Sequence, residues 1–434
     1  MKRDNSGRLL GLVFILLFLP SARLSGQEPS TLRLDEVLRL AHERSPRLRA
    51  ARERVEATRA MEPGAGLIPD PMFQVGVMNL AIPEFSPTMP ASMAPTFQAM
   101  QRLPLAGKLS LMGEIAQETT GLDMASAEET WWEVRTDAAT AFYRIYEVDR
   151  QLEVMRETLG LLRDFETVAR SMYSAGRGRQ ADVLRANVEV SRMEAEVARM
   201  TAMRAAAASR LNAVLDQPGE TPVPSPILPP LPRETPDGSA LTEWSHETRP
   251  LLRSMRQELE RAGTRRELAR KQIWPDLTIG VQYGFGRMAG DYKGMGGASV
   301  GFSVPLFAGR RQLKARDEAA AMEGMARARL DQAEATVDAR VTEVLADLEQ
   351  SRTLIRLYRE DILPQARAGV ESSLSSYRVG AVDFMTLVDA QMAVNRFQSE
   401  YYGLLASYGT GIAKLEMTIG RDLPVTDELL TEGS

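Results

Sequence analysis

Apolar side chains recur at alternating spacings of four and three residues along two long segments of the chain. This heptad pattern predicts two very long helices that pack along partners as in a coiled coil. A helix of about 66 residues spans roughly 100 Å, more than a compact domain can use. In the segment 107–172 the pattern occupies positions 134, 138, 141, 145, 148, 152, 155, 159 and 162. In the segment 309–376 it returns 203 residues later, as Val337, Val341, Val344, Leu348, Ser351, Ile355, Tyr358 and Ile362.

Apolar residues alternate with small or polar ones in a pair of short segments before each long helix. In the first pair, Phe73, Val75 and Val77 alternate with small or polar residues, and 96–103 is a weaker return strand. In the second pair, the segments 277–285 and 298–304 have one apolar face and one face of small or polar residues. We therefore expect two antiparallel hairpins. Strands of about nine residues with one apolar face suit a transmembrane sheet, although a half-buried sheet of a soluble protein would show the same alternation.

After each long helix the chain reverses through a related turn. Tyr173 and Gly176 in the first turn match Tyr377 and Gly380 in the second, about 204 residues later. Gly380 is expected to end its helix, and Asp383 is expected to cap the helix that follows. The two turn segments read SMYSAGRGRQADVLR at 171–185 and SSLSSYRVGAVDFMTLVDAQ at 372–391.

Strands, long helix, turn and return helix occur twice in the same order, so the chain is predicted to be two copies of one unit. The segment between the copies, 216–238, contains eight prolines and is interpreted as a solvated, extended linker. The predicted organisation is a signal peptide at 1–26, a first repeat at 27–215, a linker at 216–240, a second repeat at 241–422 and a C-terminal tail at 423–434, all within one intertwined domain.

The first 26 residues have the three parts of a secretory signal. Lys2, Arg3 and Arg8 form the basic part, the apolar core is at 9–20, and small residues precede the expected cleavage site. An uncleaved membrane anchor is the alternative, although the apolar run is short for a span. Later apolar stretches are too short to cross a membrane as helices, so the mature chain is expected to be exported.

The amino-acid composition argues against several classes of function. The 434 residues include 53 basic and 58 acidic side chains, a net charge of −5, which argues against a nucleic-acid partner. Cysteine is absent, so disulfides, thiolate metal sites and cysteine nucleophiles are excluded. The two histidines, His42 and His246, are far apart in the sequence, which argues against zinc catalysis and Ser-His-Asp chemistry. We expect no enzyme activity, no cofactor and no metal site.

The strands and helices both require more than one chain. Four strands cannot close a barrel, and an open sheet edge cannot stand in lipid. An even total of at least eight strands is needed, and three chains would give twelve. Two very long helices cannot form a compact core, but with copies from neighbouring chains they could wall a long cylinder.

The chain resembles the TolC family of outer membrane efflux proteins over residues 31–422. The features that support this are the duplication, the Pro-Leu-(Phe)-Ala-Gly segment before each long helix, and the Tyr-x-x-Gly turn before an Asp-containing helix start. The resemblance implies a mainly α fold with a β-barrel part. It also implies a homotrimer with a 12-strand barrel in outer membrane lipid and a 12-helix periplasmic tunnel. As partners it implies a periplasmic adaptor and an inner membrane pump, of which we favour the RND type.

In that family the helical tips close the tunnel like an iris. TolC has aspartate rings six and nine residues after the second tip glycine, where this chain has Thr386 and Asp389. Another TolC aspartate, matched here by Asp182, contacts the tip tyrosine, matched by Tyr377. A TolC arginine of the closing network is Val382 here, which puts that network in doubt. The turn residues expected to dock the adaptor are Tyr173, Gly176, Arg177, Arg179 and Gly380.

Methionines crowd the predicted hairpins. Thioethers suit Cu(I) or Ag(I), but an adaptable side chain also packs well in loops and barrels. We therefore expect a passive exit duct, with copper- or silver-type cations favoured as cargo. Drugs or a secreted polypeptide are alternative cargoes, and an exported coiled-coil scaffold or adaptor is the alternative class of protein. The methionines are Met72, Met78, Met89, Met93 and Met100 in the first hairpin and Met288 and Met295 in the second.

Overall fold

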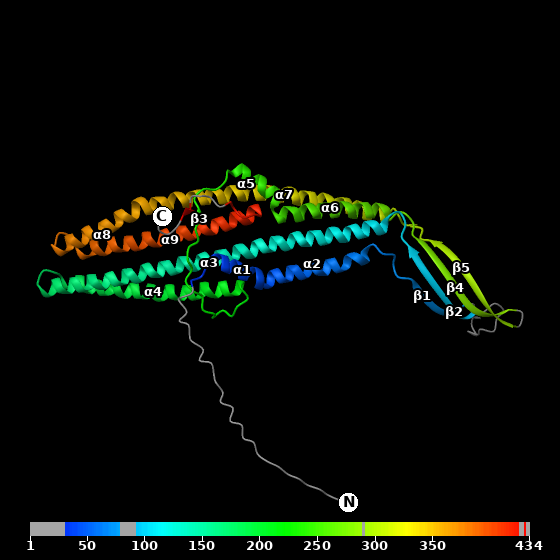
Figure 1. Cartoon of the computed structure of the whole chain (residues 1–434), viewed down its shortest axis with the longest axis horizontal. Coiled ribbons are helices and arrows are strands. Elements are labelled where there is room, and N and C mark those ends of the chain that lie inside the picture. Colours follow the sequence, from blue (N-terminus) through cyan, green and yellow to red (C-terminus); the bar gives the residue numbers. More distant parts are fainter. Residues whose placement is uncertain (1–30, 79–92, 289–290, 425–428, 431–434) are drawn as a thin grey trace, which may run out of the picture.

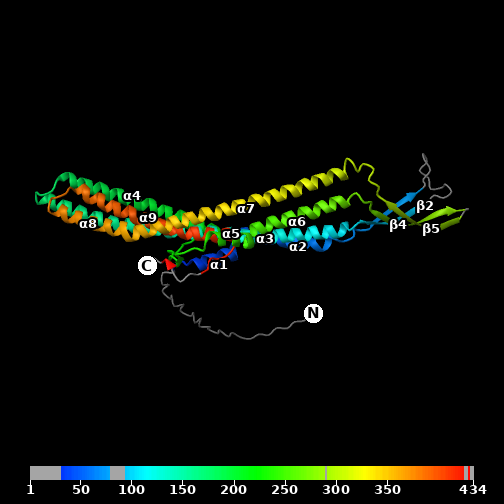
Figure 2. The ribbon, with the colours of Figure 1, turned by 90° about the horizontal axis from the view of Figure 1, so that it is seen from above.

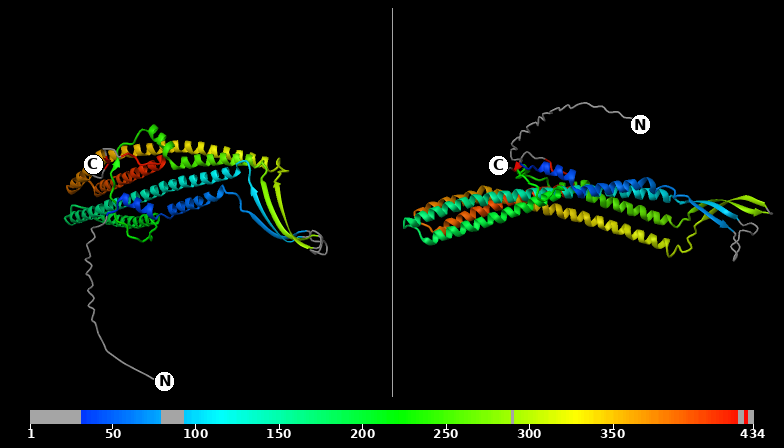
Figure 3. Two further views of the ribbon diagram at one scale, coloured as in Figure 1. Left: turned by 45° about the vertical axis from the view of Figure 1, so that its right-hand side comes forward. Right: turned by 90° about the horizontal axis from the view of Figure 1, so that it is seen from below.

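The computed structural model describes residues 31–78, 93–288, 291–424 and 429–430. The expected signal peptide and Met89 lie outside these residues. The molecule is elongated, with a sheet at one end and two helical turns at the other (Figure 1). Views from above and below show the same arrangement (Figures 2 and 3). In the described part of the chain, every helix is too short or too polar to cross a lipid bilayer.

The helices form a layer whose neighbours change along its length. Next to the sheet, α2 packs on α3, α3 on α6, and α6 on α7. Toward the turns, α3 packs on α4 and α9, and α9 packs on α7 and α8. The expected long helices and return helices are therefore present. Their bounds are α1 Leu34–Arg44, α2 Pro46–Ala65, α3 Lys108–Ser174, α4 Gln180–Val214, α5 Gly238–Thr248, α6 Pro250–Lys271, α7 Gln312–Leu357, α8 Leu363–Arg378 and α9 Phe384–Ile419.

The heptad prediction is confirmed by burial. In α3, Val134, Ala138, Ile145 and Val148 are all at most 2% exposed. Packing against α9 and its neighbours, rather than a compact core, therefore holds the long helix along its length. The corresponding buried positions of α7 are Val337, Val341, Val344, Leu348 and Ile355.

The second long helix is interrupted, which the sequence analysis did not anticipate. A π-helical turn, η1 (Tyr358–Ile362), separates α7 from α8, and the amide of Leu363 donates to the carbonyl of Tyr358. A π turn holds one extra residue, so burial passes from the expected Ile362, which is only half-buried, to Leu363. Pro364 follows directly, and in a regular α-helix its ring would press on the carbonyl of Glu360.

The four long strands form one antiparallel sheet in the order β1-β2-β4-β5. Cross-strand register places apolar residues on one face, as in the rows Phe73–Ala99–Val281 and Phe97–Tyr283. The other face has small and polar residues, including the row Gln74–Gln98–Gln282. The predicted alternation is confirmed, and β2 and β5 begin earlier than expected. The bounds are β1 Met72–Met78, β2 Met93–Leu103, β4 Leu277–Met288 and β5 Asp291–Phe302.

The proline-rich linker is extended as expected, but the prediction that it is solvated is wrong. Val223, Leu228 and Leu231 are buried against the middle of the helical layer. The carbonyl of Val223 accepts a hydrogen bond from Arg204 at 2.6 Å, and that of Pro232 accepts one from Tyr408 at 2.6 Å. Proline lacks the N–H that regular structure needs, so side chains and the short pairing of β3 (Leu231–Pro232) with β6 (Leu429–Leu430) hold this segment.

Candidate gating and docking site

Both turns end their first helix in the same way. Gly176 and Gly380 have φ of 71° and 77°, a left-handed conformation that glycine adopts without the strain of a Cβ. In the second turn, Gly380 donates to the carbonyl of Tyr377 and Ala381 to that of Ser376, each at 2.9 Å. The first turn has the equivalent pair at 3.0 and 2.9 Å. This is the Schellman motif, and the role predicted for Gly380 is confirmed.

The return helices begin differently. Asp383 caps α9, because its carboxylate accepts hydrogen bonds from the Thr386 amide at 2.9 Å and the Thr386 hydroxyl at 2.7 Å. These bonds lower the pKa of Asp383, and Arg185 and Arg179 of the first turn lower it further. Arg179, at the same position before α4, provides no side-chain cap. The predicted cap is confirmed, and the Thr386 hydroxyl, expected at the aperture, is held by it.

The two matching tyrosines have opposite environments. Tyr377 is 4% exposed and its ring packs on Phe384 with centroids 5.6 Å apart. Its buried hydroxyl has no hydrogen-bond partner among the described residues. Burial raises the pKa of Tyr377, and the charge of nearby Asp182 raises it further. Asp182 is therefore close to Tyr377 but not hydrogen-bonded to it, whereas Tyr173 is 47% exposed.

A hydrophobic cluster beneath the turns joins all four helices. Phe384, Leu387 and Val388 of α9 are at most 1% exposed. This stretch was expected to be a gate, and its buried core was not predicted, although the spacing of three and four residues indicates one buried face. The other buried members are Leu162, Phe165, Ala169, Ala186, Met193 and Tyr377.

The remaining expected site residues lie on the surface. Asp389 and Thr386 are exposed three residues apart on α9, so they share one helix face. Gly176, Arg177, Arg179 and Gly380 are also exposed, as a docking surface requires. Whether Asp389 lines an aperture depends on neighbouring chains, so its role stays a prediction.

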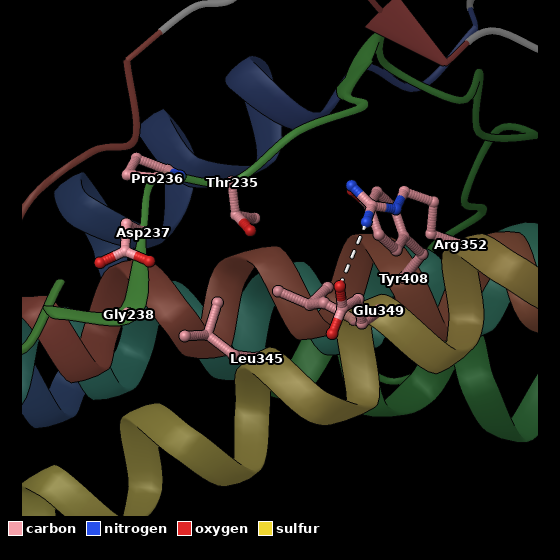
Figure 4. A pocket seen from close by; sticks show the side chains of 9 residues that line it. Thr235, Pro236, Asp237, Gly238, Leu345, Glu349, Arg352 and Tyr408 are labelled. Carbon is pink, nitrogen blue, oxygen red and sulfur yellow. Dashed lines mark hydrogen bonds and ion pairs between the residues drawn. The ribbon is translucent and has the colours of Figure 1, made fainter. Parts of the chain in front are cut away.

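The rest of the described chain adds a pocket to this picture but no metal site. The described residues contain no group of three or more His, Cys, Asp or Glu placed to hold a metal ion. Met72 and Met100 are cross-strand neighbours on the small and polar face of the sheet. In mid-molecule, a pocket of about 260 Å³ between the linker and α7 is lined by Asp237, Glu349 and Arg352 among others (Figure 4). It contains none of the expected site residues.

Comparisons with known proteins cover nearly the whole chain. A family model described as outer membrane efflux protein matches residues 243–421, the second repeat. The cobalt-zinc-cadmium resistance protein CzcC of Cupriavidus metallidurans is 23% identical over 403 residues, which cover 90% of both chains.

Solved structures with the same architecture include three outer membrane channels. VceC of Vibrio cholerae has a TM-score of 0.77 at 16% identity, over 90% of this chain and 96% of that one. CusC has a TM-score of 0.76 at 16% identity, over 89% and 92%. MtrE of Neisseria gonorrhoeae, in its open state, has a TM-score of 0.72 at 16% identity, over 90% and 89%. These structures establish a TolC-like fold. The second repeat matches the outer membrane efflux protein model, and nearly the whole chain has the fold of these outer membrane channels.

Proposed function

We propose that three copies of this chain form the passive exit duct of a tripartite efflux system. The observation that carries the proposal is the pair of open edges along the molecule. In the sheet, β1 and β5 each pair with one strand only, and α2 and α7 stand at the matching edges of the helical layer. Unpaired strand edges are not stable in lipid. Three copies joined edge to edge would give a closed ring of twelve strands above a helical tunnel.

The two faces of the sheet support this assembly. Phe73, Val281 and Val300 are 76%, 56% and 66% exposed, and such a continuous apolar surface suits contact with acyl chains. The opposite face, with its row of glutamines, suits a water-filled interior. The strands would therefore face lipid on one side and cargo on the other.

The cargo and partners follow from the relatives and from the chain's own chemistry. CzcC is by its name a cobalt, zinc and cadmium resistance protein, which supports transition-metal cations as cargo. Selection of the cargo would fall to an inner membrane pump, with the RND type favoured. A periplasmic adaptor would dock at the exposed turns, through Tyr173, Gly176, Arg177, Arg179 and Gly380.

The duct and the alternative scaffold can be separated directly. The duct requires trimers that resist detergent and conduct ions in planar bilayers. A monomeric chain without conductance would instead favour the alternative, an exported coiled-coil scaffold or adaptor. For cargo, a deletion strain should lose tolerance to cobalt, zinc or cadmium, or to the copper and silver expected from the methionines. Unchanged tolerance to all five metals would reject metal cargo and favour drugs or a secreted polypeptide.

The aperture proposal has its own test at Asp389. Three symmetric carboxylates would attract multivalent cations, so Asp389→Ala should weaken block by such cations added from the periplasmic side. Asp164→Ala is a suitable control, because Asp164 is exposed on α3 away from the turn. Unaltered block in bilayer recordings of the Asp389 variant would remove this residue from the aperture.

A further inference from the structure

A cavity of about 540 Å³ lies where the helical layer meets the sheet. It lies between the ends of β2, α6 and β5 and the beginnings of α3, β4 and α7, far from the helical turns. Six of its lining residues have chemistry that the proposed duct leaves unexplained: Arg102, Lys108, Trp274, Leu306, Phe307 and Arg311.

The cavity has two cationic groups available for a ligand. The ammonium of buried Lys108 is already bound, at 2.7 Å from both the Asp276 carboxylate and the Trp274 carbonyl. Arg102 and Arg311, in contrast, are exposed and have no ion-pair partner within the described parts of the chain. Guanidinium groups present several donors in a planar fork, which suits carboxylate, sulfonate and phosphate oxygens.

The same cavity has an apolar wall that is open to solvent. Trp274, Leu306 and Phe307 are 62%, 84% and 70% exposed. Large apolar side chains gathered this openly mark a surface that contacts another group. The matching turn of the first repeat is less apolar, because Leu105 is 39% exposed and no phenylalanine follows it. The wall is therefore particular to the second repeat.

Strand register places Arg102, one of the lining residues, on a defined face of the sheet. Arg102 pairs with Thr278, which pairs with Gly301. This row lies on the face of Gln98 and Gln282, opposite the apolar face, because side chains alternate along a strand. Under the proposed function that face is the interior of the duct, and the inference rests on it. The cavity would then lie on the path from the tunnel into the sheet.

We propose that this cavity is a binding site for organic anions with an aromatic or aliphatic body. Arg102 and Arg311 bind the anionic group, and Trp274, Leu306 and Phe307 contact the apolar body. Binding from the interior would slow these anions as they leave the tunnel. The duct would thus distinguish amphiphilic anions from the metal cations of the proposed cargo.

The test is block of single channels by 1-naphthalenesulfonate added from the periplasmic side, with 1-naphthalenemethanol as the uncharged analogue. In the wild type the sulfonate should block at lower concentration than the alcohol. In Arg102→Gln/Arg311→Gln it should block roughly tenfold less well, because two charge-assisted contacts are lost, and the alcohol should be unaffected. Leu306→Ser/Phe307→Ser should weaken block by both compounds. Arg310→Gln is the matched control, since Arg310 is the adjacent exposed arginine and does not line the cavity.

The outcomes separate this proposal from the duct itself. Normal conductance with equal sulfonate block in wild type and double arginine variant would overturn the binding site and leave the duct intact. Absence of conductance in the wild type would instead contradict the proposed function. If native mass spectrometry showed a phospholipid that stays bound to the wild type but not to the arginine variant, and the sulfonate did not block, the cavity would belong to the membrane and the proposal would be wrong.

Discussion

The two helical hairpins share one sequence pattern, but their turns are stabilised by different contacts. The first has an uninterrupted α3, an exposed Tyr173 and no side-chain cap on α4. The second has a π turn, a buried Tyr377 and a capped α9. The second turn is therefore held by more contacts than the first. We expect the second turn to be the more stable of the two.

The π turn also explains a discrepancy in the sequence. The heptads of the two repeats are related by 203 residues, whereas their turns are related by 204. One residue must therefore be added between heptad and turn in the second repeat, and η1 holds it. Because of this addition, the buried face stays continuous through two sets of positions spaced by seven, first Val341, Leu348 and Ile355, then Leu363, Val370 and Tyr377.

The largest effect is expected from truncating the buried tyrosine. Tyr377→Ala should destabilise the second turn by about 3–4 kcal/mol, since it leaves a cavity among α3, α4, α8 and α9. Tyr173→Ala, its match in the first repeat, should cost about 0.5 kcal/mol or less, because that ring is exposed. Hydrogen exchange of the amides in 372–391 and 171–185 would measure both. Equal loss of protection in the two variants would show that the turns are equivalent.

The next effect concerns the extra residue of the π turn. Deleting Asp361 should force a regular helix and press the Pro364 ring on the preceding turn, at a cost of about 3 kcal/mol. Combining the deletion with Pro364→Ala should recover most of that loss, since the helix would then resemble α3. Thermal unfolding of the three proteins checks this. A combined variant no more stable than the single deletion would mean that the π turn has a purpose other than accommodating the proline.

A smaller effect is expected at the cap of α9. Asp383→Ala should speed exchange of the first α9 amides roughly fivefold, as for other lost N-caps, whereas Arg179→Ala should leave those of α4 unchanged. The folded-state pKa of Asp383 is lowered, so its contribution is present above the unfolded value of about 3.9. It is lost as the pH falls through the lower folded value. If the first α9 amides stayed protected at a pH below both pKa values of Asp383, Thr386 would be held by other contacts.

Most of the fold could be predicted from the sequence because its elements are long and periodic. The heptads of 134–162 and the alternation in 277–285 each depend on one repeated spacing. The linker could not be predicted in the same way. Eight prolines indicate an extended chain, but burial of Val223, Leu228 and Leu231 depends on a surface made by distant helices. The short helix α5, which begins beside it, was missed for the same reason.

The candidate site was predictable only where local rules decide it. Gly380 and Asp383 follow from backbone conformation and capping, and both were expected. The burial of Tyr377 against Phe384, and the exposure of Tyr173, follow from packing among four helices and have no signature in the matching motifs. The family resemblance suggested a contact between Asp182 and Tyr377, and the two side chains are near each other without a hydrogen bond.

The smallest change, Tyr377→Phe, tests that unpartnered hydroxyl. A buried hydroxyl without a partner is a cost, so its removal should leave stability unchanged or raise it by up to about 1 kcal/mol. The raised pKa of Tyr377 means that the folded state holds the neutral phenol. Its contribution is complete below the unfolded pKa of about 10 and is lost as the pH rises through the higher folded value. The Phe variant should therefore lose less stability than the wild type in alkaline unfolding. Tyr173→Phe is the control, because that ring is exposed. A destabilised Tyr377→Phe would mean that the hydroxyl gains a hydrogen bond in the assembled duct, and Asp182 would be its acceptor.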